Sequence, residues 1–276
     1  MSFSQDLFWP WVQAMRQTSV QELRERAQPL RYPGAQEQAS RDAEQVQALG
    51  IQTEGDWLIR HGLSGALDRR DDWMCVLGRT ALLAAELNIR GCWPSTPFMA
   101  LGTHWGAGMP VLADLCVKDR RPMFVYRQEP SHVFDTWSKT LSHKLHMHAL
   151  KRLGGSITLG GAYQRIMQAL EAQATPVVLV DAPSEGRPTI EGRCHNFAIH
   201  IREGLLGMLA REQIPYVFYR CGFDPKTNQR QLEISPCHQE TNVQCIADQA
   251  AQWLFDALQL DTAQWRLWMV AKGLIV

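Results

Sequence analysis

The stretch TPVVLVDAP at residues 175–183 decides the fold class of this chain. Its centre, VVLVD, is almost continuously apolar and rich in β-branched residues, which is typical of a strand covered on both faces. The apolar run ends at Asp181, and Pro183 follows it. A strand of this kind belongs to a largely parallel sheet that has helices on both sides.

Shorter apolar runs, often β-branched or aromatic, indicate the other strands of this sheet. They are FMALGTH at 98–104, PMFVYRQ at 122–128, SITLGG at 156–161, IPYVFYRCG at 214–222 and RQLEISP at 230–236. Helical patterns lie between most of them, for example at 131–152 and 161–173, and the chain returns to helix from residue 246. This alternation predicts an α/β fold with a mixed, largely parallel sheet flanked by helices.

The first ninety residues have helical periodicity instead. The segments SVQELRERAQPL, AQEQASRDAEQVQALGI and DDWMCVLGRTALLAAELNI are separated by Pro, Gly and polar breaks. Asp71 and Asp72 are placed where a helix cap and first turn favour acids. We therefore expect a helical N-terminal region at 1–90 packed on the core, and an α/β domain at 91–276.

The composition excludes several classes of function. The 28 basic and 28 acidic residues cancel, so charge gives no support for nucleic-acid binding. Seven cysteines without a C-x-x-C pair predict reduced thiols in a cytoplasmic protein. No apolar run reaches the ~20 residues that span a bilayer, and the N-terminus lacks the pattern of a secretory signal.

The sequence LFWPW near the N-terminus suggests how a cytoplasmic protein could contact the inner face of the membrane. Tryptophan suits both core packing and the membrane–water interface. Trp9 and Trp11, beside Phe8, are the candidates for a peripheral membrane anchor.

The segment LGTHWGAGMPVLADL at 101–115 carries the candidate chemistry. In open α/β sheets, sites gather beyond the carboxyl ends of strands, and both His104 and Asp181 follow predicted strands. Histidine can take a proton from a hydroxyl at neutral pH. The alternative is a histidine that is hydrogen-bonded in a strand–helix turn. Gly106 and Gly108 favour a functional site, because glycine lets backbone N–H groups approach a ligand or an oxyanion at the following helix N-terminus.

This segment resembles the histidine block of the lysophospholipid acyltransferase superfamily, specifically its lipid A late acyltransferase branch. In that branch a strand ends in Thr/Ser-His, followed by aromatic-Gly-Asn-Trp-Glu. Four later pieces resemble the same branch in order and spacing: VYRQEPSHVFDTWSKTLSHKLHMHALKRLGGSI, AYQRIMQALEAQATPVVLVDAP, EGLLGMLAREQIPYVFYRCGFD and QAAQWLFDALQLDTAQWRLWM. The resemblance covers residues 75 to 276, and it implies a glycerolipid-acyltransferase-like fold.

The resemblance implies transfer of an acyl group from an acyl carrier protein or CoA thioester to a hydroxyl of a lipid or lipid-like acceptor, without a metal or redox cofactor. His104 matches the general base of the family. The neighbouring candidates for substrate binding are Thr103, Trp105, Gly106 and Gly108.

The acid that the family places five residues after its histidine is replaced here by Met109. Asp181 is our first candidate for its substitute, whereas Asp114 lies ten residues beyond His104 on the predicted helix and is too far. Alternatively, His104 acts unaided, or the protein is catalytically retired and binds an acyl chain, a lipid headgroup or a carrier protein.

Basic residues add further candidates for substrate binding. Arg127 ends a predicted strand, from which it would point into the same crevice and pair with a phosphate. Arg152 and Lys151 match the basic block of the family approximately, and for Lys151 a solvated position is the preferred interpretation. Tyr126 and Arg220, also at strand ends, are weaker candidates.

The histidines of HKLHMH, at 143, 146 and 148, suggest a metal site at first sight. On a helix, however, only the first two share a face, and no Asp, Glu or Cys completes a tetrahedral set at motif spacing. A partly exposed helix is the preferred interpretation.

Overall fold

The computed structural model describes residues 9–26, 33–51, 53, 55–127, 137–183 and 186–275. Phe8, and the part of the helix expected at 131–152 that precedes Trp137, lie outside these residues. No helix within the described ranges is long and apolar enough to cross a membrane.

The core of the fold is a seven-stranded sheet. Its strands are β1 (Leu87–Arg90), β2 (Met99–Gly102), β3 (Arg121–Tyr126), β4 (Ser156–Thr158), β5 (Ala174–Leu179), β8 (Tyr216–Phe223) and β9 (Arg230–Ile234). Their order is β1-β9-β8-β2-β5-β3-β4, and all neighbouring pairs are parallel except β8 with β9. The predicted α/β class, with a mixed and largely parallel sheet, is confirmed.

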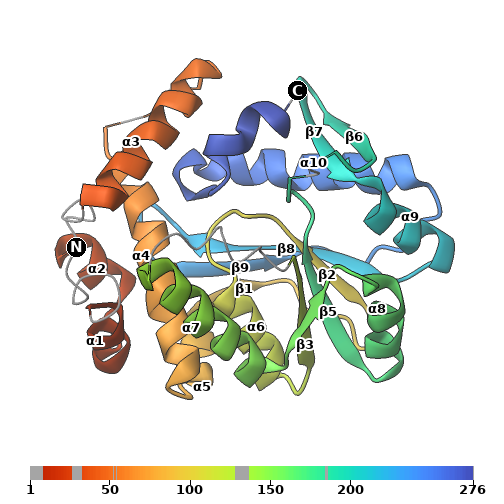
Figure 1. Cartoon of the computed structure of the whole chain (residues 1–276), viewed down its shortest axis with the longest axis horizontal. Helices are drawn as coiled ribbons and strands as arrows, with labels where there is room; N and C mark the ends of the chain where they lie inside the picture. Colours follow the sequence, from red (N-terminus) through yellow and green to blue (C-terminus); the bar gives the residue numbers. More distant parts are fainter. Residues whose placement is uncertain are drawn as a thin grey trace.

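Helices cover both faces of the sheet (Figure 1). On one face the core includes residues of α4 (Trp57–Val76), α5 (Thr80–Ala85), α6 (Met109–Val117) and α7 (Trp137–Leu153). On the other it includes residues of α8 (Ala162–Glu171), α9 (Glu203–Glu212) and α10 (Val243–Leu260). The helices α1 (Trp9–Arg16), α2 (Val20–Arg26) and α3 (Pro33–Ala48) pack against α4, and short 3-10 helices, η4 (Thr262–Gln264) and η5 (Trp268–Gly273), follow α10.

The central strands explain why the sequence is apolar without alternation. In β5, Val177 belongs to the core under α4 to α7, whereas Val178 belongs to the core under α8 to α10. Successive strand residues point to opposite faces, and here both faces are covered. Burying each such side chain stabilises the fold by about 1.5–3 kcal/mol.

Two expectations about the N-terminal region are wrong. Residues 87–90, expected within a helix, form β1 and pair with β9, so the sheet begins before residue 91. Asp71 and Asp72 do not begin a helix but lie inside α4 and are buried. Asp71 pairs with the fully buried Arg70 and with Arg230 of β9. The ion pair with Arg230, which comes from a distant strand, outweighs the preference of aspartate for helix caps. The division into two parts at residue 91 stays a prediction.

One antiparallel hairpin was not expected from the sequence. It consists of β6 (Thr189–Cys194) and β7 (Phe197–Arg202), and it packs against α10.

The topology gathers several predicted site residues at one edge. Since β2, β5 and β3 are parallel neighbours, their carboxyl ends lie together. His104, Asp181 and Arg127 each follow one of these ends by one or two residues.

Candidate active site

The structure joins His104 to Asp181. Nδ1 of His104 lies 2.8 Å from Oδ1 of Asp181, and the backbone N–H of His104 donates to both carboxylate oxygens at 2.8 and 3.0 Å. Asp181 is fully buried, whereas the His104 side chain is 30% exposed. The carboxylate therefore fixes both the backbone and the ring of the histidine.

The hydrogen bonds define the orientation of the imidazole. A carboxylate only accepts, so Nδ1–H of His104 is the donor and Nε2 of the neutral ring keeps its lone pair. Asp181 is held in turn by the indole N–H of Trp265, which donates to Oδ2 at 2.8 Å. Trp265 is fully buried and packs edge-on against Trp268. This arrangement of a base, an orienting acid and a third supporting group is suited to general-base chemistry.

The segment His104–Gly106 is held by residues 261–266, which include η4. The carbonyl of His104 accepts from the N–H of Arg266, and the Trp105 indole N–H donates to the Asp261 carbonyl. The N–H of Gly106 donates to the Gln264 carbonyl. These contacts hold His104 rigidly at the sheet edge.

Two of the backbone N–H groups that were expected near a ligand or an oxyanion are already paired within the protein. The N–H groups of Gly106 and Ala107 donate at 2.8 Å to the carbonyls of Gln264 and Cys221, because this segment pairs with its neighbours. The backbone N–H groups that could bind an oxyanion are therefore those that follow Ala107, at the N-terminus of α6, where Gly108 is the N-cap.

Gly106 has a structural reason to be glycine. Its φ is +73°, and an added Cβ would lie 1.9 Å from the Cys221 carbonyl oxygen. We expect Gly106→Ala to lower the free energy of unfolding by about 3 kcal/mol, through strain and overpacking. Gly108→Ala is the matched control: φ is −84° and no atom lies within 4 Å of the added Cβ, so urea denaturation should give a value near wild type. Equal stability of the two variants would contradict this account.

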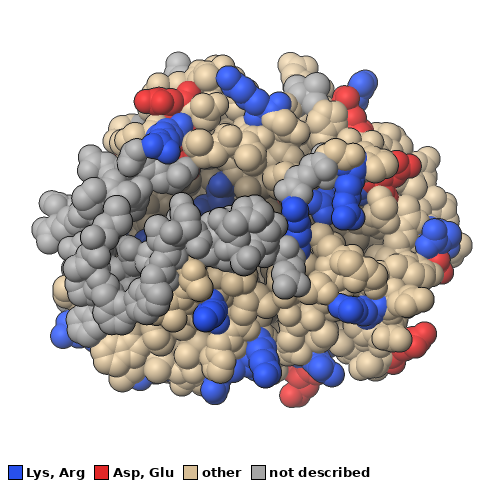
Figure 2. Space-filling view, in the orientation of Figure 1, with Lys and Arg blue, Asp and Glu red and all other residues tan. Residues whose placement is uncertain are grey.

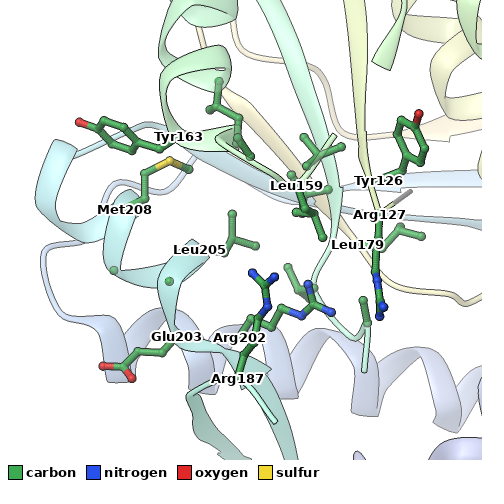
Figure 3. A pocket seen from close by; sticks show the side chains of 18 of the residues that line it. Tyr126, Arg127, Leu159, Tyr163, Leu179, Arg187, Arg202, Glu203, Leu205 and Met208 are labelled. Carbon is green, nitrogen blue, oxygen red and sulfur yellow. The ribbon is translucent and has the colours of Figure 1, made fainter. Parts of the chain in front are cut away.

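His104 lines two cavities. The first, of about 930 Å³, has a largely apolar wall that includes Leu159, Ile166 and Met208. Arginines also line it, so we name it the arginine cavity: Arg127, Arg187, Arg202 and Arg211. The guanidinium groups of Arg127, Arg187 and Arg202 gather on one side, and the carboxylate of Glu203 points away from them (Figure 3).

The arginines of this cavity influence one another. Burial and the charges of Arg187 and Arg127 lower the pKa of Arg202. Its Nη2 donates to the Pro183 carbonyl, whereas its buried Nε has no hydrogen-bond partner within the described residues. On the face seen in Figure 2, basic side chains lie inside and beside the central hollow, and acidic ones lie toward the periphery. With its apolar wall and its arginines, the arginine cavity is suited to an apolar chain attached to an anionic group.

The second cavity, of about 750 Å³, is named the histidine cavity because His104, His143 and His146 line it. It lies between α4, α6 and α7, and Thr103, Trp105, Gly106 and Gly108 contribute to its wall. The predicted substrate-binding residues next to His104 therefore face this second cavity.

Three further residues considered in the sequence analysis, Met109, Asp114 and Arg220, are not part of the His104–Asp181 pair. Met109 is buried in the core and lines the histidine cavity. Asp114 accepts from the Trp93 indole N–H and lines neither cavity. Arg220 pairs with Glu233 and lies over the Trp253 ring.

Basic residues of the predicted block at the end of α7 are not brought to His104. Arg152 is exposed beside Gly78, Lys151 is exposed, and neither lines a cavity described above. Tyr126 and Arg127, by contrast, line the arginine cavity. A substrate-binding role for Arg152 gains no support from its position.

No group of three His, Cys, Asp or Glu side chains in the described part of the chain could hold a metal ion. His143, His146 and His148 lie on α7, where His146 is hydrogen-bonded to Asp72. Of the predicted membrane anchor, Trp9 is 47% exposed on α1 and Trp11 is half-buried, and their role stays a prediction.

Several residues of the site were missed by reasoning from the sequence. Arg187 and Arg202 belong to the unpredicted hairpin and the loop before it. Trp265 lies within QWRLW, at the end of the last segment for which the sequence analysis expects a likeness to acyltransferases, and this expectation is the signal that could have marked it. Arg266, in the same segment, lines the histidine cavity.

No protein-family model matches this chain, and no curated protein is significantly similar to it.

Proposed function

We propose that this protein is an O-acyltransferase with a glycerolipid-acyltransferase-like fold, which moves an acyl group from an acyl carrier protein or CoA thioester to a hydroxyl of a lipid or lipid-like acceptor. The observation that carries this proposal is the His104–Asp181 pair, which leaves Nε2 for a substrate and lies where two cavities meet. The family resemblance of residues 101–115 supports the same reaction.

The chemistry requires one base and one acid, and a single imidazole can serve as both. Nε2 of His104 takes the proton of the acceptor hydroxyl, whose oxygen forms a bond to the thioester carbonyl carbon. The tetrahedral oxyanion then collapses, the C–S bond breaks, and the imidazolium gives its proton to the departing thiolate. Asp181 holds the ring and stabilises the imidazolium between the two steps. The products are an ester and a free thiol.

The arginine cavity fits the donor. A CoA or phosphopantetheine thioester joins an apolar acyl chain to phosphate groups, and the cavity offers an apolar wall beside several guanidinium groups. We therefore assign the acyl chain to the wall with Leu159 and Met208, and the phosphate to Arg127, Arg187 and Arg202.

The test is incubation of the purified protein with dodecanoyl-CoA or dodecanoyl carrier protein and a total lipid extract. Acyl transfer should release thiol and form a new acyl ester in equal amounts. Thiol without ester would indicate hydrolysis, and neither product with either donor would indicate a protein that binds without catalysis. Both results would overturn the proposal.

Replacing Arg187 tests the donor assignment. We expect Arg187→Ala to raise KM for dodecanoyl-CoA about tenfold, because a charge-assisted contact to phosphate is lost, with kcat unchanged. The uncharged dodecanoyl-N-acetylcysteamine thioester should keep its KM. Arg193→Ala, an exposed arginine paired with Glu191 outside the cavity, is the control. Equal increases in KM for both donors would contradict the assignment.

A further inference from the structure

A second imidazole–carboxylate pair faces the histidine cavity. His146 of α7 places Nδ1 3.0 Å from Oδ1 of Asp72, which belongs to α4. Both residues line the same cavity as His104, and the His146 side chain is 41% exposed. The two pairs have the same arrangement, in which a carboxylate engages Nδ1, although their four residues come from different segments.

Asp72 orients His146 as Asp181 orients His104. Burial by itself lowers the pKa of His146, but the hydrogen bond and charge of Asp72 outweigh it and raise the pKa above its ordinary value. With Nδ1 engaged by Asp72, Nε2 is the ring nitrogen left for a ligand in either charge state. The charged groups around the pair in this cavity are Asp68, Arg69 and Arg266, together with His143.

An independent observation also points to a polar ligand in this cavity. Thr103, which lines it next to His104, is only 6% exposed, and its Oγ1 has no hydrogen-bond partner within the described residues. A buried hydroxyl without a partner costs free energy, and a hydroxylated ligand would remove this cost. Ser142 of α7 lines the same cavity and adds another hydroxyl.

The two cavities differ in charge. In the histidine cavity Asp68 and Asp72 balance Arg69 and Arg266, whereas the arginine cavity has an excess of positive charge. An anionic donor therefore fits the arginine cavity, and an uncharged ligand that carries several hydroxyl groups fits the histidine cavity.

We propose that the histidine cavity binds the acceptor, that this acceptor carries at least two neighbouring hydroxyl groups, as a glycerol headgroup does, and that His146 contacts one hydroxyl while His104 deprotonates the other. This inference rests on the proposed acyl transfer and names the class of its acceptor. His146 thereby determines which acceptors are used, and Asp72 is the positioning residue that acts through it.

The activity test compares two acceptors with His146→Ala. 1-Decanoylglycerol has two adjacent free hydroxyls, and 3-hydroxypropyl decanoate, its counterpart without the middle hydroxyl, has one. We expect the variant to lower kcat/KM for 1-decanoylglycerol about tenfold, as expected for one lost hydrogen bond, and to leave 3-hydroxypropyl decanoate unchanged. His148→Ala, which removes an exposed histidine on the same helix that lines neither cavity, should leave both unchanged. Equal losses for the two acceptors would mean that the pair only ties α4 to α7, and no loss would mean that His146 does not contact the acceptor; either result overturns the inference.

A binding test gives an answer that does not need turnover. The imidazole resonance of His146, assigned by its absence in His146→Ala, should shift when 1-decanoylglycerol is added to wild type or to His104→Ala. An unshifted resonance overturns the acceptor site. A shifted resonance in a protein that transfers no acyl group would instead retain the binding site and refute the proposed function, so the two failures are distinguishable.

Discussion

His104→Ala is expected to lower kcat/KM for acyl transfer by about 10⁴-fold, because general-base catalysis contributes up to about 10⁴ and the orienting carboxylate acts only through this ring. The variant should fold normally, since the ring is partly exposed and its backbone contacts to Asp181 and Arg266 remain. Thiol release and ester formation from dodecanoyl-CoA measure the effect, and thermal unfolding checks the fold.

The control for this experiment is His148→Ala, which removes an exposed imidazole that lines neither cavity. It should retain the activity of wild type. If His104→Ala and wild type transferred acyl groups at the same rate, the observed reaction would not use this base, and the proposed function would be refuted.

Asp181→Asn is expected to reduce kcat by about 10⁴, the cost of losing the orienting carboxylate in a related catalytic triad. The reason lies in the donors around Asp181: the backbone N–H and Nδ1–H of His104 and the indole N–H of Trp265 all point at its oxygens. An amide presents an NH₂ group to at least one of them, which turns the ring or selects the other tautomer. Stability should also fall, by about 1–3 kcal/mol, because a buried donor loses its acceptor.

Asp114→Asn is the control that separates the effect of Asp181→Asn on kcat from its effect on stability. Asp114 is also buried and accepts from a tryptophan N–H, but it lines neither cavity. The Asp114→Asn variant should be less stable than wild type and should have the kcat of wild type. Wild-type activity in Asp181→Asn would show that the carboxylate does not orient the base, and His104 would then act unaided.

Local patterns predicted much of the sheet but not all of it. β5 and β2 are almost entirely apolar because helices cover both of their faces, so the sequence indicates both strands. The hairpin strand β6, TIEGRC, contains few apolar residues, and its Gly192 allows close approach to α10, where an added Cβ would lie 2.2 Å from the Ala247 carbonyl oxygen. A strand that depends on such a tertiary contact has no periodic pattern of its own. The arginines that this region brings to the cavity were therefore missed as well.

The prediction for Asp71 and Asp72 in the N-terminal region was wrong for a different reason. Aspartate prefers helix caps, and the pair at 71–72 was interpreted in that way. In the structure Arg70 and Arg230 hold Asp71, and His146 holds Asp72, within a buried segment of α4. Two of these partners, Arg230 and His146, are distant in the sequence, and no local preference contains that information.

The sequence by itself determined the α/β class and placed His104 and Asp181 directly after apolar strands, because burial on two faces leaves a continuous apolar run that ends where the chain leaves the sheet. Only the tertiary structure decided that these residues meet. They are 77 positions apart, and their contact depends on β2 and β5 being parallel neighbours. Strand order follows from packing of the whole sheet, so it also decided that Asp181, and not a residue at the position of Met109, holds the histidine.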